Sequence, residues 1–324
     1  MKSINLWRIA AAVLIMCTGS AHAEAWPVKP VRLIVPSPAG AQNDIAARVI
    51  GEQLSKIWHQ PVIVDNKPGG GTIIGTNAVA KAAPDGYTIG WVISAHAINP
   101  TLFTNLPYDT VHDFAGVTLV YALKPVIVAA PAFSASSVTE LIELARRNPG
   151  KLTFASPANG SSIHLLGELF KLKYGLDVEH VAYKGVTVAH PDVMEQRVSF
   201  MFDALTSVLP YVQSGKLKVI AAVSDSPLPD HPEYPLLRGL LPSGAAIGWN
   251  GLVVPAKTPP QLIATLNADI VAAIRSPEVQ QRLAAFGVET IVSTPAGFDA
   301  FIREDMTRWA DVIKRAGIKA EGAK

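Results

Sequence analysis

Short runs of apolar and β-branched residues alternate along this chain with longer stretches in which apolar positions recur every three or four residues. The short runs are typical of buried strands, and the periodic stretches are typical of helices with one buried face. In the first third of the chain, this pattern predicts strands at residues 31–35, 61–65 and 87–93 and helices at residues 44–58 and 73–82. Such an alternation indicates a mostly parallel sheet that is covered by helices on both faces.

The alternation is interrupted at Lys124-Pro125, where two apolar segments meet without a helix between them. It then resumes, and residues 225–248, which are rich in proline and glycine, predict a long surface connection. The remaining predicted elements are strands at 116–121, 126–130, 152–155, 178–182, 198–202, 217–223 and 252–254 and helices at 138–148, 162–174, 190–196, 207–214, 259–275, 277–286 and 295–316. A proline opens each of the last three helices, where the geometry of a first turn tolerates it.

Two α/β units that are joined near residue 124 and again near residue 250 predict a two-lobed molecule with a ligand cleft between the lobes. We place lobe 1 at residues 24–124 and 251–324 and lobe 2 at residues 125–250. A chain of 324 residues is long enough for two domains of ordinary size. The predicted fold class is therefore α/β, with two mostly parallel sheets flanked by helices.

Residues 1–23 have the three parts of a secretory signal peptide. Lys2 and Arg8 give a positive start, residues 9–16 are apolar, and Ala21-His22-Ala23 is a small-x-small cleavage site. The apolar stretch is shorter than the roughly 20 residues that a membrane-spanning helix needs, which disfavours a retained anchor. Bulky Met16 disfavours a lipoprotein processed at Cys17. We therefore expect export to the periplasm with cleavage of the leader.

Composition narrows the possible functions of the exported part. The only cysteine, Cys17, lies in the leader, so the mature chain has no thiolate nucleophile, disulfide or cysteine-ligated metal. Without Lys2 and Arg8, the 28 basic residues become 26, which equals the 26 acidic residues. A chain this close to neutrality lacks the basic footprint of a protein that binds nucleic acid. No side-chain spacing indicates a metal, and we expect no cofactor.

Three loops in the predicted sheets, at residues 36–44, 156–164 and 183–187, have the composition of ligand-binding turns. In parallel α/β sheets, ligands bind where strands end and helices begin, because helix N-termini offer unpaired N–H groups to carboxylate or phosphate. Residues 36–44 lead into the first helix, and Asn43 or Asp44 can cap it. Residues 156–164 combine three hydroxyl groups, an amide and a glycine before a helix that carries His164. The first two loops equally fit ordinary capped turns, and His164 also fits a packed structural histidine.

Further polar residues follow other predicted strands. Tyr183 and Lys184 follow the strand at 178–182, Asp203 follows the strand at 198–202, and Ser94 follows the strand at 87–93. Each has an ordinary alternative as a solvent-facing side chain or a helix cap. The glycine run 69–71 lacks the lysine of a P-loop and the spacing of a dinucleotide fingerprint, so it favours a tight turn over a nucleotide site.

Several motifs in order resemble those of one family. The most specific stretch is Asp65-Asn66-Lys67-Pro68-Gly69-Gly70-Gly71-Thr72-Ile73-Ile74-Gly75, which is followed by Ala83-Pro84-Asp85-Gly86-Tyr87-Thr88. Tyr183-Lys184-Gly185 and Trp249-Asn250-Gly251-Leu252 are further matches. Over essentially the whole mature chain, the sequence resembles the substrate-binding proteins of tripartite tricarboxylate transporters, which are often called Bug proteins.

The resemblance implies a type II periplasmic binding-protein fold that closes on a small carboxylate, either an aliphatic or an aromatic di- or tricarboxylate. It also implies a non-enzymatic monomer that delivers this ligand to the integral-membrane permease subunits of the transporter. Carried over to this chain, and with Ser94 added from its position, the expected ligand-binding residues are Ser37, Pro38, Ala39, Gly40, Asp44, Ser94, Ser156, Asn159, Ser161, Ser162, His164, Tyr183 and Asp203. Ala39 stands where the family usually has glycine, and Val188 and Gln196 stand where it expects proline and glycine.

Two other functions remain open from the sequence. One is a secreted serine hydrolase that uses Ser161 or Ser162 with His164, although the chain has no G-x-S-x-G motif and no evident third group. The other is a receptor that reports ligand occupancy to a sensor kinase. The sequence fixes neither the identity of the ligand nor its number of carboxyl groups.

Overall fold

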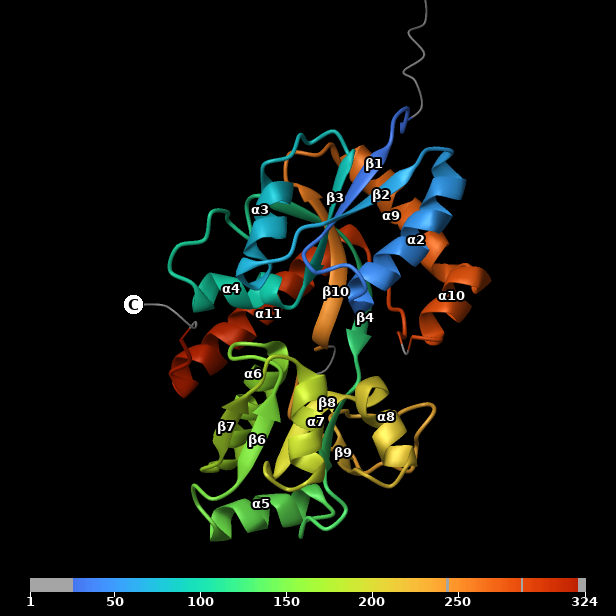
Figure 1. Cartoon of the computed structure of the whole chain (residues 1–324). Coiled ribbons are helices and arrows are strands. Elements are labelled where there is room, and N and C mark those ends of the chain that lie inside the picture. Colours follow the sequence, from blue (N-terminus) through green and yellow to red (C-terminus); the bar gives the residue numbers. More distant parts are fainter. Residues whose placement is uncertain (1–25, 243–244, 287, 320–324) are drawn as a thin grey trace, which may run out of the picture.

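The computed structural model describes residues 26–242, 245–286 and 288–319. These residues form two lobes, one above the other in Figure 1, each built around a five-stranded sheet. The predicted signal peptide, residues 1–23, lies outside the described residues. Within the described part, no helix combines the length and the apolar character needed to cross a membrane.

The first sheet has the strand order β2-β1-β3-β10-β4. Its strands are β1 (Val31–Val35), β2 (Val62–Asn66), β3 (Thr88–Ile93), β4 (Phe114–Leu123) and β10 (Ile247–Pro255). Strand β1 is parallel to both of its neighbours, whereas β10 runs antiparallel to β3 and β4. The helices of this lobe are α2 (Gln42–Trp58), α3 (Ile73–Ala80), α4 (Ala95–Leu102), α9 (Pro260–Arg275) and α10 (Pro277–Ala284), with a 3-10 turn, η1 (Gly70–Thr72).

The second sheet has the order β7-β6-β8-β5-β9. Its strands are β5 (Pro125–Ala129), β6 (Thr153–Ser156), β7 (Glu179–Ala182), β8 (Phe200–Ala204) and β9 (Lys218–Ala222). Strand β6 is parallel to β7 and β8, and β5 runs antiparallel to β8 and β9. Its helices are α5 (Val138–Arg147), α6 (Ser162–Tyr174), α7 (Val186–Met194) and α8 (Leu205–Gln213).

The two sheets have the same topology, although the sequence shows no repeat. In each sheet, the antiparallel strand is the one that follows a strand of the other lobe in the chain. Strand β5 follows β4 of the first sheet, and β10 follows β9 of the second sheet. Only Lys124 separates β4 from β5, and Leu123 pairs with Ile247 at the start of β10. The two crossings between the lobes therefore lie side by side and can act as one hinge.

Helix α11 (Pro295–Ala316) connects the lobes at a second place. Its first part packs against β4 and α4, and its C-terminal end lies beside α6 (Figure 1). The buried side chains of Trp309 and Ile313 belong to the same apolar cluster as Leu165 and Phe170 of α6. Because this apolar contact removes area from water on one side of the cleft, it resists separation of α6 from lobe 1.

The predicted two-lobed α/β fold is confirmed, although the bounds of several elements differ from the predicted ones. Strand β8 extends to Ala204, so Asp203 lies inside this strand instead of after it. Helix α4 was not predicted, because its sequence contains Asn99-Pro100. Strand β10 is longer than the predicted 252–254 and begins inside the predicted loop, since Gly248 and Gly251 interrupt its apolar pattern. A Cβ atom at Gly251 would lie 2.2 Å from the Phe298 ring, so close packing requires glycine there. Helix α7 begins at Val186 instead of near residue 190.

Candidate functional site

A cavity of about 430 Å³, the central cavity, lies between the lobes. Gln42 and Asn43, at the N-terminus of α2, line it from lobe 1, and Ser161 and Ser162, at the N-terminus of α6, line it from lobe 2. Its other lining residues include Ser94, Asn99, Asn159 and Asn250 and the apolar side chains of Ile93, Ile98, Leu102, Phe103, Tyr121 and Leu123. The central cavity thus combines hydrogen-bonding ends with an apolar wall, as small-molecule sites do.

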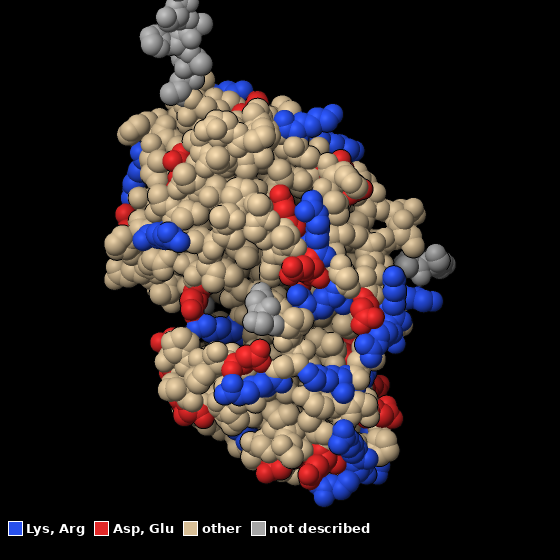
Figure 2. Space-filling view, turned by 180° about the vertical axis from the view of Figure 1, so that it is seen from behind, with Lys and Arg blue, Asp and Glu red and all other residues tan. Residues whose placement is uncertain are grey.

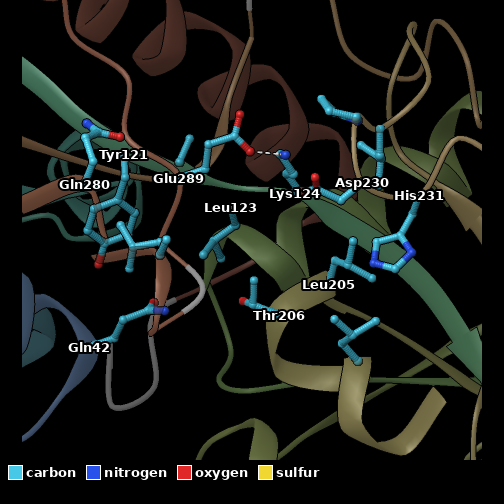
Figure 3. A pocket seen from close by; sticks show the side chains of 16 residues that line it. Gln42, Tyr121, Leu123, Lys124, Leu205, Thr206, Asp230, His231, Gln280 and Glu289 are labelled. Atoms are coloured by element: carbon cyan, nitrogen blue, oxygen red, sulfur yellow. Dashed lines mark ion pairs between the residues drawn. The ribbon is translucent and has the colours of Figure 1, made fainter. Parts of the chain in front are cut away.

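Two further cavities adjoin the central one. The lobe 2 cavity, about 610 Å³, shares Gln42, Leu123, Ser161 and Ser162 with it and extends to Asp203 and to the starts of α7 and α8. The hinge cavity, about 380 Å³, shares Gln42 and Leu123 with both and is lined by both lobes (Figure 3). Because the three cavities share lining residues, we treat them as one interlobe cleft.

The helix N-termini at this cleft have backbone N–H groups without protein partners. The residue before α2 is Ala41, which has no side chain to cap the helix. Among the described residues, no partner is present for the N–H groups of Gln42 and Asn43, nor for those of Ser162 and Ile163. Helix N-termini carry such free donors together with a partial positive charge, which favours a bound anion.

Asp44 shapes the loop before α2 and is not part of the cleft lining. Its buried carboxylate accepts hydrogen bonds from the Gly40 N–H at 2.8 Å, from Asn66 at 2.9 Å and from Arg48 at 3.1 Å. Burial alone would raise the pKa of Asp44, but the hydrogen bonds from Arg48, Gly40 and Asn66 outweigh it and hold the pKa below its ordinary value. An aspartate with these partners fixes the loop conformation.

The structure therefore places the loop predicted after β1 beside the cleft. Pro38, Ala39 and Gly40 are exposed, and Ser37 donates a hydrogen bond to the side chain of Asn43 at 2.8 Å. None of these four residues lines the three cavities, whereas the following Gln42 and Asn43 do. Ligand contacts by Ser37 to Gly40 and by Asp44 stay predictions.

The loop before α6 supplies most of the predicted residues that the structure does bring to the cleft. Asn159, Ser161 and Ser162 line the central cavity, as does Ser94 from the other lobe. Ser161 caps α6 by accepting the His164 N–H at 3.1 Å. The Asn159 side chain donates to the Lys319 carbonyl at 3.0 Å, which ties the loop to the segment after α11.

Ser156 and His164 lie beneath this loop and do not line the cleft. Nδ1 of His164 accepts the Gly160 N–H at 2.9 Å, and Nε2 lies 3.7 Å from the Glu168 carboxylate. Both ring nitrogens thus face protein groups other than the hydroxyls of Ser161 and Ser162. His164 cannot act as the base of a serine hydrolase in this arrangement, and it serves as a packed structural histidine.

Tyr183 is also not among the residues that line the cleft. Its hydroxyl donates to the Asp192 carboxylate at 2.6 Å. Burial, together with this hydrogen bond and the charge of Asp192, raises the pKa of Tyr183 to about 12. Tyr183 therefore connects the β7–α7 loop to α7 within lobe 2, and its predicted ligand contact stays a prediction.

Charged side chains are scarce in the cleft. Among the described residues that line the central and lobe 2 cavities, Asp203 is the one charged side chain, and neither lysine nor arginine is present. In the hinge cavity, Lys124 forms an ion pair with Glu289 (Figure 3). On the outer surface, basic and acidic side chains are interspersed over the face shown in Figure 2. Apart from Asp203, the charged side chains among the described residues that line the cleft thus lie in the hinge cavity.

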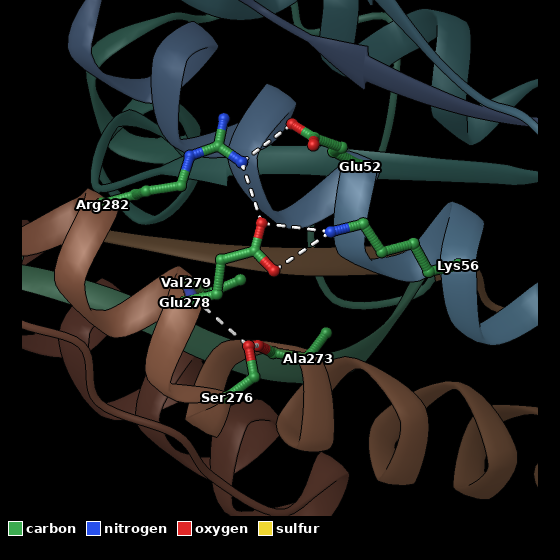
Figure 4. A network of polar contacts seen from close by, with 7 residues as sticks. All are labelled: Glu52, Lys56, Ala273, Ser276, Glu278, Val279 and Arg282. Atoms are coloured by element: carbon green, nitrogen blue, oxygen red, sulfur yellow. Dashed lines mark hydrogen bonds and ion pairs between the residues drawn. The ribbon is translucent and has the colours of Figure 1, made fainter.

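An ion-pair network holds α10 against α2 (Figure 4). Lys56 binds Glu278 at 3.1 Å, and Arg282 binds Glu52 at 2.8 Å. Exposed pairs of this kind contribute little stability individually, but they favour one orientation of α10. This orientation places Phe286 at the edge of the lobe 2 cavity.

Several amides of the cleft are not among the expected ligand-binding residues. Gln42 bonds the Phe286 carbonyl at 3.3 Å, and Asn99 bonds the Gly71 carbonyl at 2.9 Å. Asn250 accepts from the indole of Trp91 at 2.8 Å and belongs to the part of β10 that was not predicted as a strand. An amide at a helix start was the available signal for Gln42, and a position soon after the strand at 87–93 was the signal for Asn99, whereas Asn250 needed the position of β10.

Comparisons with known proteins agree with this architecture. The sequence model described as "Tripartite tricarboxylate transporter family receptor" matches residues 46–318. BugT of Bordetella pertussis is 33% identical over 324 residues, which cover 98% of this chain and 99% of BugT. The structure of periplasmic binding protein BugD is 29% identical with a TM-score of 0.72, over 91% of this chain and 99% of that one. R. palustris Rpa4515 with adipate is 29% identical with a TM-score of 0.75, over the same shares.

Proposed function

The chain belongs to the tripartite tricarboxylate transporter family of receptors, and we propose that it captures a small carboxylate in the periplasm and delivers it to the membrane subunits of such a transporter. It is a solute-binding protein and not an enzyme, so the hydrolase alternative is wrong. The adipate bound to the related Rpa4515 supports a carboxylate as the ligand class.

One observation carries the ligand assignment: N-termini of helices from opposite lobes line one cavity. Gln42 and Asn43 of α2 and Ser162 of α6 surround the same space, and their free N–H groups suit carboxylate oxygens. Neutral amide and hydroxyl side chains around them add donors. Water can bridge any gap that a small ligand leaves, at little energetic cost.

The same arrangement explains how binding changes the shape of the receptor. A carboxylate bonded to both helix starts holds the lobes together, while the chain crossings at Lys124 and Ile247 permit rotation. The ligand favours the closed state only to the extent that it binds this state more tightly than the open one. A membrane partner that recognises the closed state would then receive loaded receptors.

A ligand screen tests the carboxylate assignment. The mature protein is heated with a panel of mono-, di- and tricarboxylates, and with a neutral sugar and an organic cation as controls. A ligand at 100 times its Kd stabilises the folded state by about 2.7 kcal/mol, so we expect a melting-temperature rise of several degrees with at least one carboxylate. The assignment fails if the sugar or the cation stabilises the protein and no carboxylate does.

Delivery and location need separate measurements. Fractionation of cells should recover the protein in the periplasm, with Glu24 as its first residue. Pulldown with the loaded receptor should recover permease subunits, and deletion of the gene should abolish uptake of the ligand. Recovery of a sensor kinase with unchanged uptake would instead support the signalling alternative.

A further inference from the structure

Asp203 has an unusual position for an acidic residue in a site for anions. Only 2% of its surface is exposed, yet it lines the lobe 2 cavity together with Ser162, Val186 and Ser207. A buried carboxylate costs free energy unless partners satisfy it. Its presence in a cleft without lysine or arginine therefore calls for a functional explanation.

Hydrogen bonds within lobe 2 fix the Asp203 carboxylate in place. Oδ2 lies 2.8 Å from Nε2 of His190, and Oδ1 accepts the Ala204 N–H at 2.7 Å. Because an ionised carboxylate only accepts hydrogen bonds, Nε2 of His190 donates to Asp203, and Nδ1 has no partner among the described residues. Each carboxylate oxygen can accept a second hydrogen bond, and the capacity for two bonds remains.

Helix N-termini around the same cavity stabilise this negative charge. The starts of α6, α7 and α8 all contribute lining residues, namely Ser162, Val186 and Thr206. Their partial positive charges favour an anion, and Asp203 already supplies one. The opposite wall differs, because the start of α2 has no cap and the one acid in its first turn, Asp44, is bonded to Arg48. The lobe 1 wall of the cleft thus offers free N–H donors, whereas the lobe 2 wall carries the negative charge of Asp203.

We propose that Asp203 is a specificity-determining residue that selects carboxylates bearing a hydroxyl or ammonium group. The ligand carboxylate lies at the start of α2 and near Ser162, and its hydroxyl or ammonium group donates to Asp203. Gln42, Ser161 and Ser162 line both cavities, so one small molecule can reach both ends. This inference rests on the proposed function and names the class of ligand for that site.

The charge distribution also disfavours a second carboxylate in this part of the cleft. A second negative group beside Asp203 would meet a like charge with no lysine or arginine nearby to compensate it. Lys124, in the hinge cavity, is already paired with Glu289. A monocarboxylate with a donor group therefore fits the central and lobe 2 cavities better than a dicarboxylate of the same length.

Calorimetry on ligands that share a carbon skeleton tests the proposal. Propionate, lactate and alanine share one three-carbon skeleton: propionate lacks a donor group, lactate carries a hydroxyl and alanine carries an ammonium group. Succinate, malate and aspartate form the matching four-carbon set. A hydrogen bond to a charged group corresponds to a factor of about ten or more in affinity. In the unmodified protein, we expect the donor-bearing members of a set to bind about tenfold more tightly than the plain member.

The affinities of the variant Asp203→Asn then test whether Asp203 causes the preference for donor-bearing ligands. The amide keeps the side-chain shape, and His190 can move its proton to Nδ1 and accept from the new amide. We expect the ammonium-bearing ligand to lose about tenfold or more in affinity, while the plain carboxylate binds as well as before or better. Asp311→Asn, an exposed acid on α11 paired with Arg315, is the matched control and should change neither affinity.

The measurements distinguish a wrong role for Asp203 from a wrong assignment of the protein as a carboxylate receptor. Equal binding of plain and donor-bearing carboxylates, or an unchanged affinity ratio in Asp203→Asn, overturns the role of Asp203 while the carboxylate receptor stands. Absence of binding by every carboxylate overturns both. If Asp203→Asn does not fold, the affinity ratios measured with Asp203→Ser and with the unmodified protein still test the role of Asp203.

Discussion

The imidazole rings of His164 and His180 stack with their centroids 3.7 Å apart and their planes 14° from parallel. His164 accepts the N–H of Gly160, and His180 lies 2.7 Å from the hydroxyl of Ser156. The two stacked rings thus hold opposite ends of the loop that precedes α6. Since this loop carries Ser161, the pair positions one wall of the cleft without lining it.

Replacing His164 by alanine should therefore weaken both the fold and ligand binding. The change removes the acceptor for the buried Gly160 N–H and leaves a cavity beside His180, with an expected loss of about 2–4 kcal/mol in unfolding free energy. Denaturant unfolding and calorimetry measure the two effects. His164→Asn, whose amide oxygen lies near the position of Nδ1, should lose less of both. Wild-type ligand affinity in His164→Ala would contradict this positioning role.

Acidification from pH 7 to pH 5 should lower the unfolding free energy. Burial, the largest cause in each case, lowers the pKa of His180 to about 4 and that of His96 to about 3, from an ordinary value of 6.5. Between the folded and unfolded pKa values, the unfolded chain binds more protons, so stability falls as the pH falls. Burial raises the pKa of Asp305 to about 6, and its contribution therefore has the opposite sign.

Two histidines outweigh one aspartate, so the net slope between pH 7 and pH 5 should be positive. Urea unfolding at several pH values measures this slope. His180 is only half-buried, which screens part of its contribution, and His180→Gln should flatten the profile without abolishing it. A profile that is flat in the unmodified protein, or that rises toward low pH, would show that these histidines do not dominate the response.

Gly160→Ala should destabilise the protein and also disturb the cleft. Gly160 has φ +73°, and an added Cβ would lie 2.5 Å from Cδ2 of Leu102 in lobe 1, which itself lines the central cavity. We expect a loss of about 1–2 kcal/mol from backbone strain, together with weaker ligand binding as Leu102 moves. Gly175→Ala is the control, because Gly175 has φ +62° with no atom nearby. It should lose similar stability and keep its affinity.

The sequence predicted most elements of the fold, because local apolar patterns determine them. Strand β1 was predicted with its correct bounds, since residues 31–35 are almost entirely β-branched or leucine and become buried. Strand β10 was missed in part because Gly248 and Gly251 pack closely against Leu123 and Phe298, which lie far away in the sequence. Element type thus follows from local pattern, whereas glycine in a strand depends on tertiary contacts.

The site was less predictable for the same reason. The sequence located the loop after β1 but could not tell which of its residues face the cleft. The answer depends on the hydrogen bond from Asn66 to Asp44, which joins β2 to α2 across 22 residues. Likewise, nothing local indicates that His190 satisfies Asp203, 13 residues away. Sequence patterns thus identified the kinds of side chain at the site, whereas long-range hydrogen bonds determine which of these side chains face the cleft.

Ser162→Asp should have opposite effects on stability and on ligand binding. Ser162 is the first residue of α6, where an acidic side chain interacts favourably with the helix dipole, by about 0.5 kcal/mol. The same carboxylate would occupy the wall of the central cavity and repel a ligand carboxylate, so affinity should fall at least about tenfold. Thermal unfolding without ligand and calorimetry with it measure the two effects. Ala296→Asp, in the first turn of α11 and outside the cleft lining, should stabilise similarly and leave affinity unchanged. Tighter carboxylate binding by Ser162→Asp would mean that the ligand does not approach the start of α6.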